Sequence, residues 1–147
     1  MKFIERQQDL FTVDSKYTFV HCVSVDCEMG AGIAKEFQKR YNLKGAVKAR
    51  CQGLGTATRF ATWDRYVGWI WVFNLMTKHF YWHKPSYETL RLSLLDLKKQ
   101  CLTLKINYLA MPQIGCGLDR LNWNQVKEII IEIFEDTDIE ILVCSLK

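Results

Sequence analysis

Two glycine-bearing turns in this sequence have a composition that suits phosphate binding. The first, residues 26–32, reads Asp-Cys-Glu-Met-Gly-Ala-Gly, and the second, residues 112–121, contains Gly115 and Gly117. Each turn follows an apolar stretch typical of a buried strand and precedes a helical pattern. The N–H groups at a helix start lack partners within the helix and attract anions, and glycine lets the backbone approach oxygen atoms closely. Together the turns could hold a diphosphate, but glycine is also common at inert turns of this kind.

Neither turn matches the motifs of the common nucleotide-binding folds. The sequence lacks the GxxxxGK[ST] pattern of phosphate loops, and Gly30-Ala31-Gly32 is not the GxGxxG of dinucleotide-binding enzymes. These mismatches argue against an ATPase and against a Rossmann-type dehydrogenase.

Two ionisable residues lie where they could act on a ligand held by the turns. Lys78 follows the apolar stretch 69–76, and Asp119 lies in the second turn before a helical pattern. A lysine amine attacks as a nucleophile only when burial or a neighbouring charge favours its neutral form. From the residues alone, a solvent-facing lysine and an aspartate at a helix start remain open alternatives.

The cysteines and histidines indicate packing rather than a metal site. The six cysteines include no CxxC pair, and His21, Cys22 and Cys27 have no second ligand pair at a usable spacing. We therefore expect no metal, and without an export signal we expect no disulfide. His21 lies within an apolar strand and is expected to be a core histidine, whereas His79 and His83 could line a cleft.

Length and composition fit one globular domain covering residues 1–147. Hydrophobic residues make up 49% and charged residues 24% of the 147 residues, and the net charge is only +4. The densest basic stretch, Lys35–Lys48, is expected to be a solvated helix face. No apolar run is long enough for a membrane span, and the N-terminus does not resemble a signal peptide. We expect a cytoplasmic monomer, with the nucleus or an infected host cell as further possible locations.

Strand and helix patterns alternate along the chain, which predicts an α/β fold. Expected strands are residues 2–5, 17–25, 106–111 and 139–146, and expected helices begin near Ile33, at Pro85 and after Asn122. Residues 56–62 and 65–76 are expected to form a hairpin that turns at Trp63-Asp64. The tryptophans are expected to lie mostly in the core.

Four blocks of this sequence resemble the macrodomain family, whose members bind ADP-ribose. The blocks run in family order over nearly the whole chain: Asp9–Phe11; His21–Ala34; Thr77-Lys78 with His83–Tyr87; and Met111–Leu121. The last block is the most specific, because many macrodomains carry glycine where Asp119 stands. The branch it is most similar to contains terminal ADP-ribose protein glycohydrolase and the antitoxins that remove ADP-ribose from DNA. The resemblance implies a three-layer α/β/α sandwich with a mixed central sheet.

The resemblance also implies a role for each matching residue. Asp9 would accept a hydrogen bond from the adenine amine, and Leu10 would contact the same ring. Lys78 would be the nucleophile and Asp119 its acid/base partner, beside the distal ribose. The phosphates and the distal ribose would be held by two groups of residues: Ser24, Met29, Gly30, Ala31, Gly32 and Ile33; and Ile114, Gly115, Cys116, Gly117 and Leu118.

Some positions depart from the family pattern. Gln8 stands where macrodomains usually carry glycine, Gln113 replaces the arginine of the glycohydrolase, and the Asn-Ala-Asn motif of other macrodomains is absent. These departures bear on substrate preference more than on ADP-ribose binding.

The resemblance implies a hydrolase that needs neither metal nor cofactor and removes ADP-ribose from acidic protein side chains or from nucleobases. A non-catalytic ADP-ribose reader and a phosphatase or deacylase of free ADP-ribose derivatives are the alternatives. A basic nucleic-acid-binding domain is disfavoured by the small net charge and by the lack of an aromatic and basic sequence motif.

Overall fold

The computed structural model describes residues 1–146 and is built on a six-stranded mixed sheet. The strand order across the sheet is β1-β6-β5-β2-β4-β3. Neighbouring strands run parallel except β3, which is antiparallel to β4. The strands are β1 Lys2–Gln7, β2 Thr18–Ser24, β3 Ala57–Asp64, β4 Gly68–Lys78, β5 Tyr108–Met111 and β6 Glu140–Ser145.

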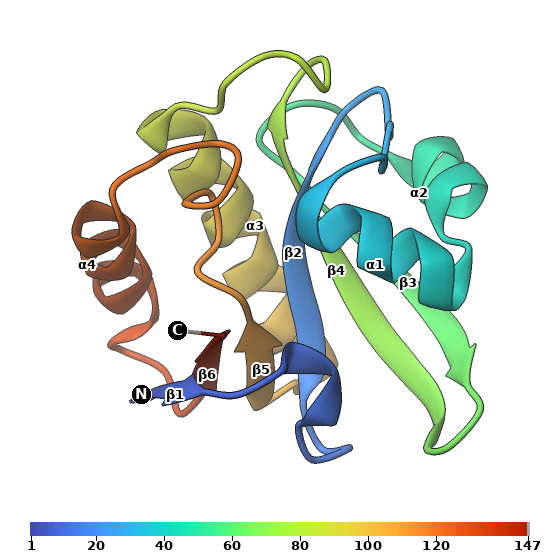
Figure 1. The fold of residues 1–147 in the computed structure, drawn as a ribbon. Helices are drawn as coiled ribbons and strands as arrows, with labels where there is room; N and C mark the ends of the chain where they lie inside the picture. Colours follow the sequence, from blue (N-terminus) through green and yellow to red (C-terminus); the bar gives the residue numbers. More distant parts are fainter. Residues whose placement is uncertain (147) are drawn as a thin grey trace.

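Helices cover both faces of the sheet, which confirms the predicted α/β/α layers (Figure 1). Helices α1 (Gly32–Tyr41) and α2 (Lys44–Arg50) lie on one face, and α3 (Tyr87–Leu104) and α4 (Trp123–Phe134) lie on the other. A short 3₁₀ turn, η1 (Leu10–Thr12), follows β1.

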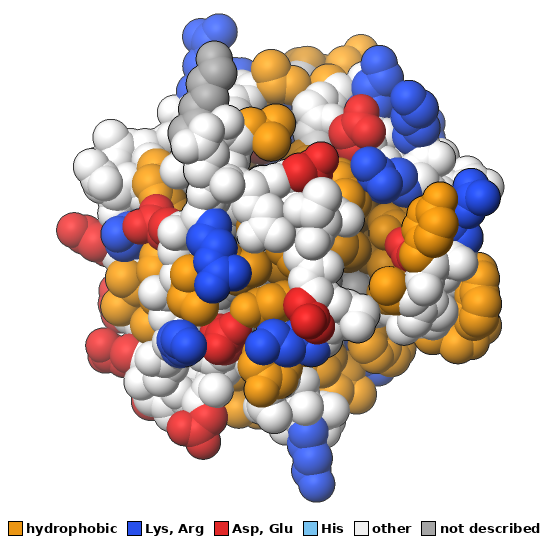
Figure 2. Space-filling view, turned by 60° about the horizontal axis from the view of Figure 1, so that its bottom comes forward, with side chains coloured by type: hydrophobic (Ala, Val, Ile, Leu, Met, Phe, Trp, Pro, Cys, Tyr) orange, Lys and Arg blue, Asp and Glu red, His pale blue; other side chains and the backbone are white. Residues whose placement is uncertain are grey.

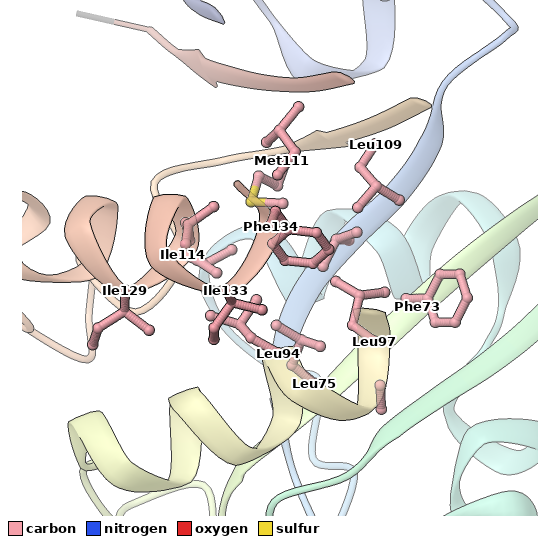
Figure 3. Close-up of a cluster of buried hydrophobic side chains, with 14 of the residues drawn as sticks. Phe73, Leu75, Leu94, Leu97, Leu109, Met111, Ile114, Ile129, Ile133 and Phe134 are labelled. Carbon is pink, nitrogen blue, oxygen red and sulfur yellow. The ribbon is translucent and has the colours of Figure 1, made fainter. Parts of the chain in front are cut away.

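Each pair of helices buries its own apolar core against the sheet. On the α3–α4 side the core includes Leu94, Leu97 and Phe134 packed on Phe73 and other strand residues (Figure 3). The α1–α2 side has a separate cluster of buried residues that includes Phe37, Leu43 and Val47. Because both faces of the sheet are buried, the central strands have apolar residues at nearly every position.

Side-chain caps fix where α3 and α4 begin. Ser86 accepts a hydrogen bond from the Thr89 amide as the N-cap of α3, so the helix begins just after the predicted Pro85. Asn122 accepts one from the Gln125 amide and caps α4, as predicted.

The β3–β4 hairpin turns later than predicted. The strands remain paired through Trp63 with Trp69 and Asp64 with Gly68, so the turn lies at residues 65–67 and not at Trp63-Asp64. The Asp64 side chain accepts hydrogen bonds from the amides of Tyr66 and Val67, two and three residues further on, and so shapes the turn itself. Gly68, with a φ of +90°, lets the backbone leave the turn and begin β4.

The expectation that the tryptophans lie mostly in the core is wrong. Trp63, Trp69 and Trp82 have 60%, 72% and 62% of their surface exposed. Along β4, exposed Trp69 and Trp71 alternate with the buried Ile70 and Val72, because successive strand residues point to opposite faces. Hydrophobic side chains accordingly reach the surface between charged ones in Figure 2.

The exposure of the basic stretch agrees with expectation. In the basic stretch, Lys35, Lys39 and Lys48 are exposed, as a solvated helix face requires. All six cysteines are free thiols. Over residues 1–146, no helix is both long and apolar enough to cross a membrane.

Candidate functional site

The main cleft lies where three neighbouring parallel strands end. Strands β2, β4 and β5 end at Ser24, Lys78 and Met111, and β2 pairs with both of the others. Their following loops therefore meet at one edge of the sheet, which is the common place for ligands in open α/β folds. The loops enclose a cleft of about 970 Å³. A nucleotide-sized ligand fits such a volume.

One wall of the cleft is the loop from β2 into α1. Ala31 is the N-cap of α1 but makes no side-chain capping hydrogen bond, and the first helical turn contains no acidic residue. Gly32 begins the helix with a φ of +58°. The cleft therefore borders a helix start whose N–H groups are open to an anion.

The opposite wall is the turn after β5. Gly115 has a φ of +73°, and a Cβ at this position would lie 2.9 Å from the Leu121 side chain, so the turn requires glycine. A Cβ at Gly117 would meet nothing within 4 Å. Leu118 reaches across to the first wall, where its Cδ1 lies 3.4 Å from the position that a Cβ of Gly32 would occupy. The two glycine-bearing turns thus face each other across the cleft.

Lys78 and Asp119 form an ion pair at one end of the cleft. Lys78 Nζ donates to Asp119 Oδ1 over 2.7 Å, and each side chain is only 15% exposed. Lys78 is the last residue of β4, and Asp119 belongs to the turn after β5. The fold therefore brings together the two residues that the resemblance assigns to catalysis, with little solvent to screen their interaction.

The two cysteines beside this pair are unsuited to act as nucleophiles. Burial and the negative charge of Asp119 raise the pKa of the Cys22 thiol to about 12 and that of Cys116 to about 11. At neutral pH both thiols stay protonated, and the thiolate is the reactive form. Burial therefore disfavours both thiols as nucleophiles at this end of the cleft.

Asp26 is a cleft residue that the sequence did not single out. Its carboxylate accepts hydrogen bonds from the Ser24 hydroxyl and from the amides of Glu28 and Tyr81. Burial raises the pKa of Asp26, but these hydrogen bonds outweigh it and hold the pKa below the usual 3.8. The charged carboxylate thus ties the β2–α1 loop to the loop after β4. The Ser-x-Asp spacing before a glycine-bearing turn was the available signal.

Tyr81 and Lys84 are two further cleft residues that sequence reasoning missed. Both belong to the loop between β4 and α3. Lys84 Nζ donates to the Leu118 carbonyl over 2.8 Å and so bridges this loop to the turn after β5. Lys84 lies inside one of the family-like blocks, but its role depends on a contact between loops that are distant in sequence.

A second cavity of about 300 Å³ adjoins the main cleft. Asp9, Leu10 and Cys116 line it, and it shares Ile33 and Gly117 with the main cleft, so the two cavities are neighbours and are together called the depression. Asp9 Oδ1 accepts the Phe11 amide as the N-cap of η1. The predicted adenine contacts thus lie at the end of the depression away from the Lys78–Asp119 pair.

The structure places most of the predicted ligand-binding residues along this depression. The main cleft is lined by Ser24, Gly30, Ala31, Gly32, Ile33, Ile114, Gly115, Gly117 and Leu118. Met29 is not among the residues that line the two cavities; it is only 4% exposed and packs in the α1–α2 core. Among residues 1–146, no three His, Cys, Asp or Glu side chains are grouped so that they could hold a metal ion.

Comparison with known proteins places the chain in a family. The Macro domain family model matches residues 20–130. A Bos taurus protein named ADP-ribose glycohydrolase OARD1 is 43% identical over 138 residues, which cover 94% of this chain and 88% of that protein. A Thermus aquaticus DNA ADP-ribosyl glycohydrolase is 30% identical over 120 residues, covering 79% of this chain but only 33% of its own length.

A solved structure shares the fold. The macrodomain of Mycobacterium tuberculosis DarG matches with a TM-score of 0.86 at 24% identity, over 97% of this chain and 96% of that one. With the family model and the relatives agreeing over most of the sequence, this chain belongs to the Macro domain family.

Proposed function

We propose that this protein is a hydrolase that removes mono-ADP-ribose from acidic protein side chains or from nucleobases. The observation that carries the proposal is the Lys78–Asp119 ion pair, whose side chains are mostly buried at the end of a cleft between two glycine-bearing turns. Relatives named ADP-ribose glycohydrolase and DNA ADP-ribosyl glycohydrolase support it. A reader of ADP-ribose would need the glycine-bearing turns and Asp9 but not the pair.

In this proposal the ligand lies along the depression. The adenine occupies the second cavity, where Asp9 and Leu10 contact it. The diphosphate lies between the N-terminus of α1 and the turn at Gly115–Leu118, whose N–H groups supply the hydrogen bonds. The distal ribose then reaches Lys78 and Asp119 at the other end.

The proposed reaction begins with a proton transfer inside the ion pair. Asp119 takes a proton from the Lys78 ammonium, and the free amine attacks the anomeric carbon of the distal ribose. The new bond to Nζ forms as the bond from the anomeric carbon to the modified group breaks, and the bonding electrons leave with that group. As that bond breaks, Asp119 passes its proton to the departing group, and its regained negative charge beside Lys78 stabilises the cation-like transition state. Water then attacks the anomeric carbon as Nζ leaves. Asp119 takes the proton from this water and returns it to the Lys78 amine, which releases ADP-ribose and restores the ion pair.

The test is an activity panel with variants of the pair. The substrates are an ADP-ribosylated glutamate peptide and oligonucleotides carrying ADP-ribosylated thymidine or guanosine. Lys78→Ala should lower turnover by several orders of magnitude, while its affinity for ADP-ribose changes by less than about 1 kcal/mol, because the amine acts mainly in the transition state. Asp119→Asn should be at least as damaging. Lys99→Ala, an exposed lysine on α3, is the matched control and should leave turnover unchanged.

Two outcomes would contradict this proposal in different ways. Wild-type turnover by a Lys78→Ala, Asp119→Ala double variant would remove both residues from the mechanism. Binding of ADP-ribose without hydrolysis of any panel substrate would make the protein a reader.

The single-domain, monomeric and intracellular character expected from the sequence stays a prediction. Sedimentation velocity would test whether the protein is a monomer.

A further inference from the structure

The loop between β4 and α3 exposes three consecutive aromatic side chains. Phe80, Tyr81 and Trp82 have 44%, 59% and 62% of their surface exposed. A group of large aromatic side chains held in solvent usually marks an interaction site. We define these three residues as the aromatic loop.

The rings of the aromatic loop pack on one another instead of into the core. Phe80 and Trp82 stack with ring centroids 4.7 Å apart and planes 9° from parallel. Tyr81 meets Trp82 edge to face at 5.2 Å. The loop thus presents broad aromatic surface that is already ordered before any partner binds.

Hydrogen bonds to both walls of the cleft hold the aromatic loop at its mouth. The Tyr81 amide donates to Asp26 Oδ2 over 3.2 Å, which ties the loop to the β2–α1 wall. Lys84 donates to the Leu118 carbonyl over 2.8 Å, which ties it to the other wall. The aromatic surface is therefore fixed relative to the Lys78–Asp119 pair.

The aromatic loop borders the catalytic end of the depression and not the adenine end. Tyr81 and Lys84 line the main cleft together with Lys78 and Asp119, whereas Asp9 lines only the second cavity. A group attached to the distal ribose leaves the cleft from the catalytic end. That group must therefore pass beside the aromatic loop.

Basic side chains near the aromatic loop are a second feature that suits a nucleic-acid strand. Lys84 is exposed two residues after Trp82 and lines the main cleft, and the exposed Arg120 directly follows Asp119. The nearby carboxylate of Asp26 is already engaged by three hydrogen bonds. Single-stranded nucleic acids bind to aromatic rings that stack with bases and to cations that contact the phosphates.

We propose that the aromatic loop binds unpaired nucleobases next to an ADP-ribosylated base, so that the preferred substrate is single-stranded nucleic acid. This inference rests on the proposed hydrolase function, because it concerns the group from which ADP-ribose is removed. Phe80, Tyr81, Trp82 and Lys84 are neighbours in the sequence, but only the fold shows that they are exposed beside the cleft.

The test compares three substrates that differ in what surrounds the scissile bond. They are a single-stranded oligonucleotide with one ADP-ribosylated base, the corresponding isolated ADP-ribosylated nucleoside, and an ADP-ribosylated glutamate peptide. A Phe80→Ala, Trp82→Ala double variant should lose about tenfold or more in kcat/KM on the oligonucleotide, because stacked bases lose their aromatic partners. Its kcat/KM on the nucleoside and on the peptide, and its affinity for ADP-ribose, should stay unchanged.

A control variant separates this site from exposed aromatic surface in general. Trp63→Ala, Trp69→Ala removes two equally exposed tryptophans from the β3–β4 hairpin and should leave all three activities unchanged. Trp82→Phe retains a stacking ring and should recover most of the loss seen in Trp82→Ala. Equal loss of activity on all three substrates, or a loss confined to the peptide, would overturn the proposal.

A binding measurement keeps this inference testable if the protein hydrolyses nothing. Fluorescence anisotropy of an unmodified, labelled single-stranded oligonucleotide reports binding without turnover. Weaker binding by the Phe80→Ala, Trp82→Ala variant than by the wild type and the hairpin variant supports the aromatic loop as a nucleic-acid site. Equal affinity of all three proteins overturns it, and failed hydrolysis with intact binding counts only against the proposed reaction.

Discussion

His21 is held as a neutral imidazole in the centre of the sheet. Its side chain is fully buried, stacks on Phe37 and lies with Nε2 2.6 Å from Asn74 Oδ1. The Asn74 amide nitrogen donates to the Thr58 carbonyl, so Oδ1 must be the acceptor and His21 Nε2 carries the proton. Burial lowers the pKa of His21 to about 4, more than the hydrogen bond to Asn74 raises it.

This buried histidine predicts a loss of stability on mild acidification. The unfolded chain takes up a proton near the ordinary pKa of 6.5, whereas folded His21 does so only near 4. The stabilisation is therefore complete above pH 6.5 and falls as the pH drops towards 4. Between pH 7 and pH 5 the loss from this group should be about 2 kcal/mol in the free energy of unfolding.

Urea denaturation at pH 7 and pH 5 measures this loss. His21→Gln, whose amide can still donate to Asn74, removes the titrating group and should show a smaller drop over the same pH interval. An equal drop in wild type and variant would mean that His21 does not cause the acid sensitivity.

At the scale of single residues, the sequence predicted some roles and missed others for a physical reason. His21 was expected in the core from its apolar neighbours, and this is confirmed. Lys78 and Asp119 are 41 residues apart in the chain, and their pairing depends on β4 and the turn after β5 meeting in space. Only the family resemblance could connect them. Lys84 was missed because its partner lies in another loop, whereas Asp26 was missed although Ser24 and Glu28 are local partners.

At the scale of elements, the turn after β5 contains two glycines with different structural roles. Gly115 needs its positive φ and has no room for a Cβ beside Leu121. Gly117 has neither constraint but lines the cleft. One glycine is therefore required by the fold and the other is open to substitution without strain.

This difference predicts opposite effects of two substitutions. Gly117→Glu should leave the melting temperature nearly unchanged and abolish ADP-ribose binding, because it places a carboxylate where we propose that a phosphate lies. Gly115→Ala should lower the free energy of unfolding by about 1–3 kcal/mol through strain and the Leu121 contact. Thermal denaturation and calorimetric titration of both variants check this. Unchanged affinity in folded Gly117→Glu would place the phosphates elsewhere.

Sequence patterns predicted the elements better than their edges. The alternation of apolar strands and amphipathic helices was clear from the sequence. The Asn122 cap of α4 was predicted because asparagine is a favoured N-cap residue. The hairpin turn was misplaced because Trp63 and Asp64 still pair across the strands. The tryptophans were misassigned because hydrophobicity alone does not show which parts of a strand are covered by a helix. That depends on how far α3 extends over the sheet.

At the scale of the whole molecule, strand order creates the site. β5 lies between β6 and β2, and β4 lies on the other side of β2, although these strands are far from consecutive in the chain. Their parallel direction places the loops after β2, β4 and β5 at one edge. No local pattern in the sequence encodes this strand order. The cleft was therefore predicted from the family resemblance and not from the periodicity of hydrophobic residues.

A ligand that spans both cavities should stabilise the whole fold. ADP-ribose in the proposed position contacts loops from β1, β2, β4 and β5, which unfolding separates. At a concentration about 100 times its dissociation constant, a ligand that binds only the folded state adds about 2.7 kcal/mol. For a protein of this size that corresponds to a rise of about 5–10 °C in melting temperature. AMP, which lacks the second phosphate and the distal ribose, should give a smaller rise at the same concentration.

Variants of two aspartates connect that rise to the adenine end of the depression. Asp9→Ala should weaken ADP-ribose binding by about 1–3 kcal/mol, because the adenine amine loses its acceptor, and should reduce the thermal shift accordingly. Asp14→Ala, an exposed aspartate outside both cavities, is the control and should keep the full shift. Equal shifts with AMP and ADP-ribose would mean that only the adenosine end is bound. The depression would then hold a mononucleotide, and the Lys78–Asp119 pair would have no distal ribose to act on.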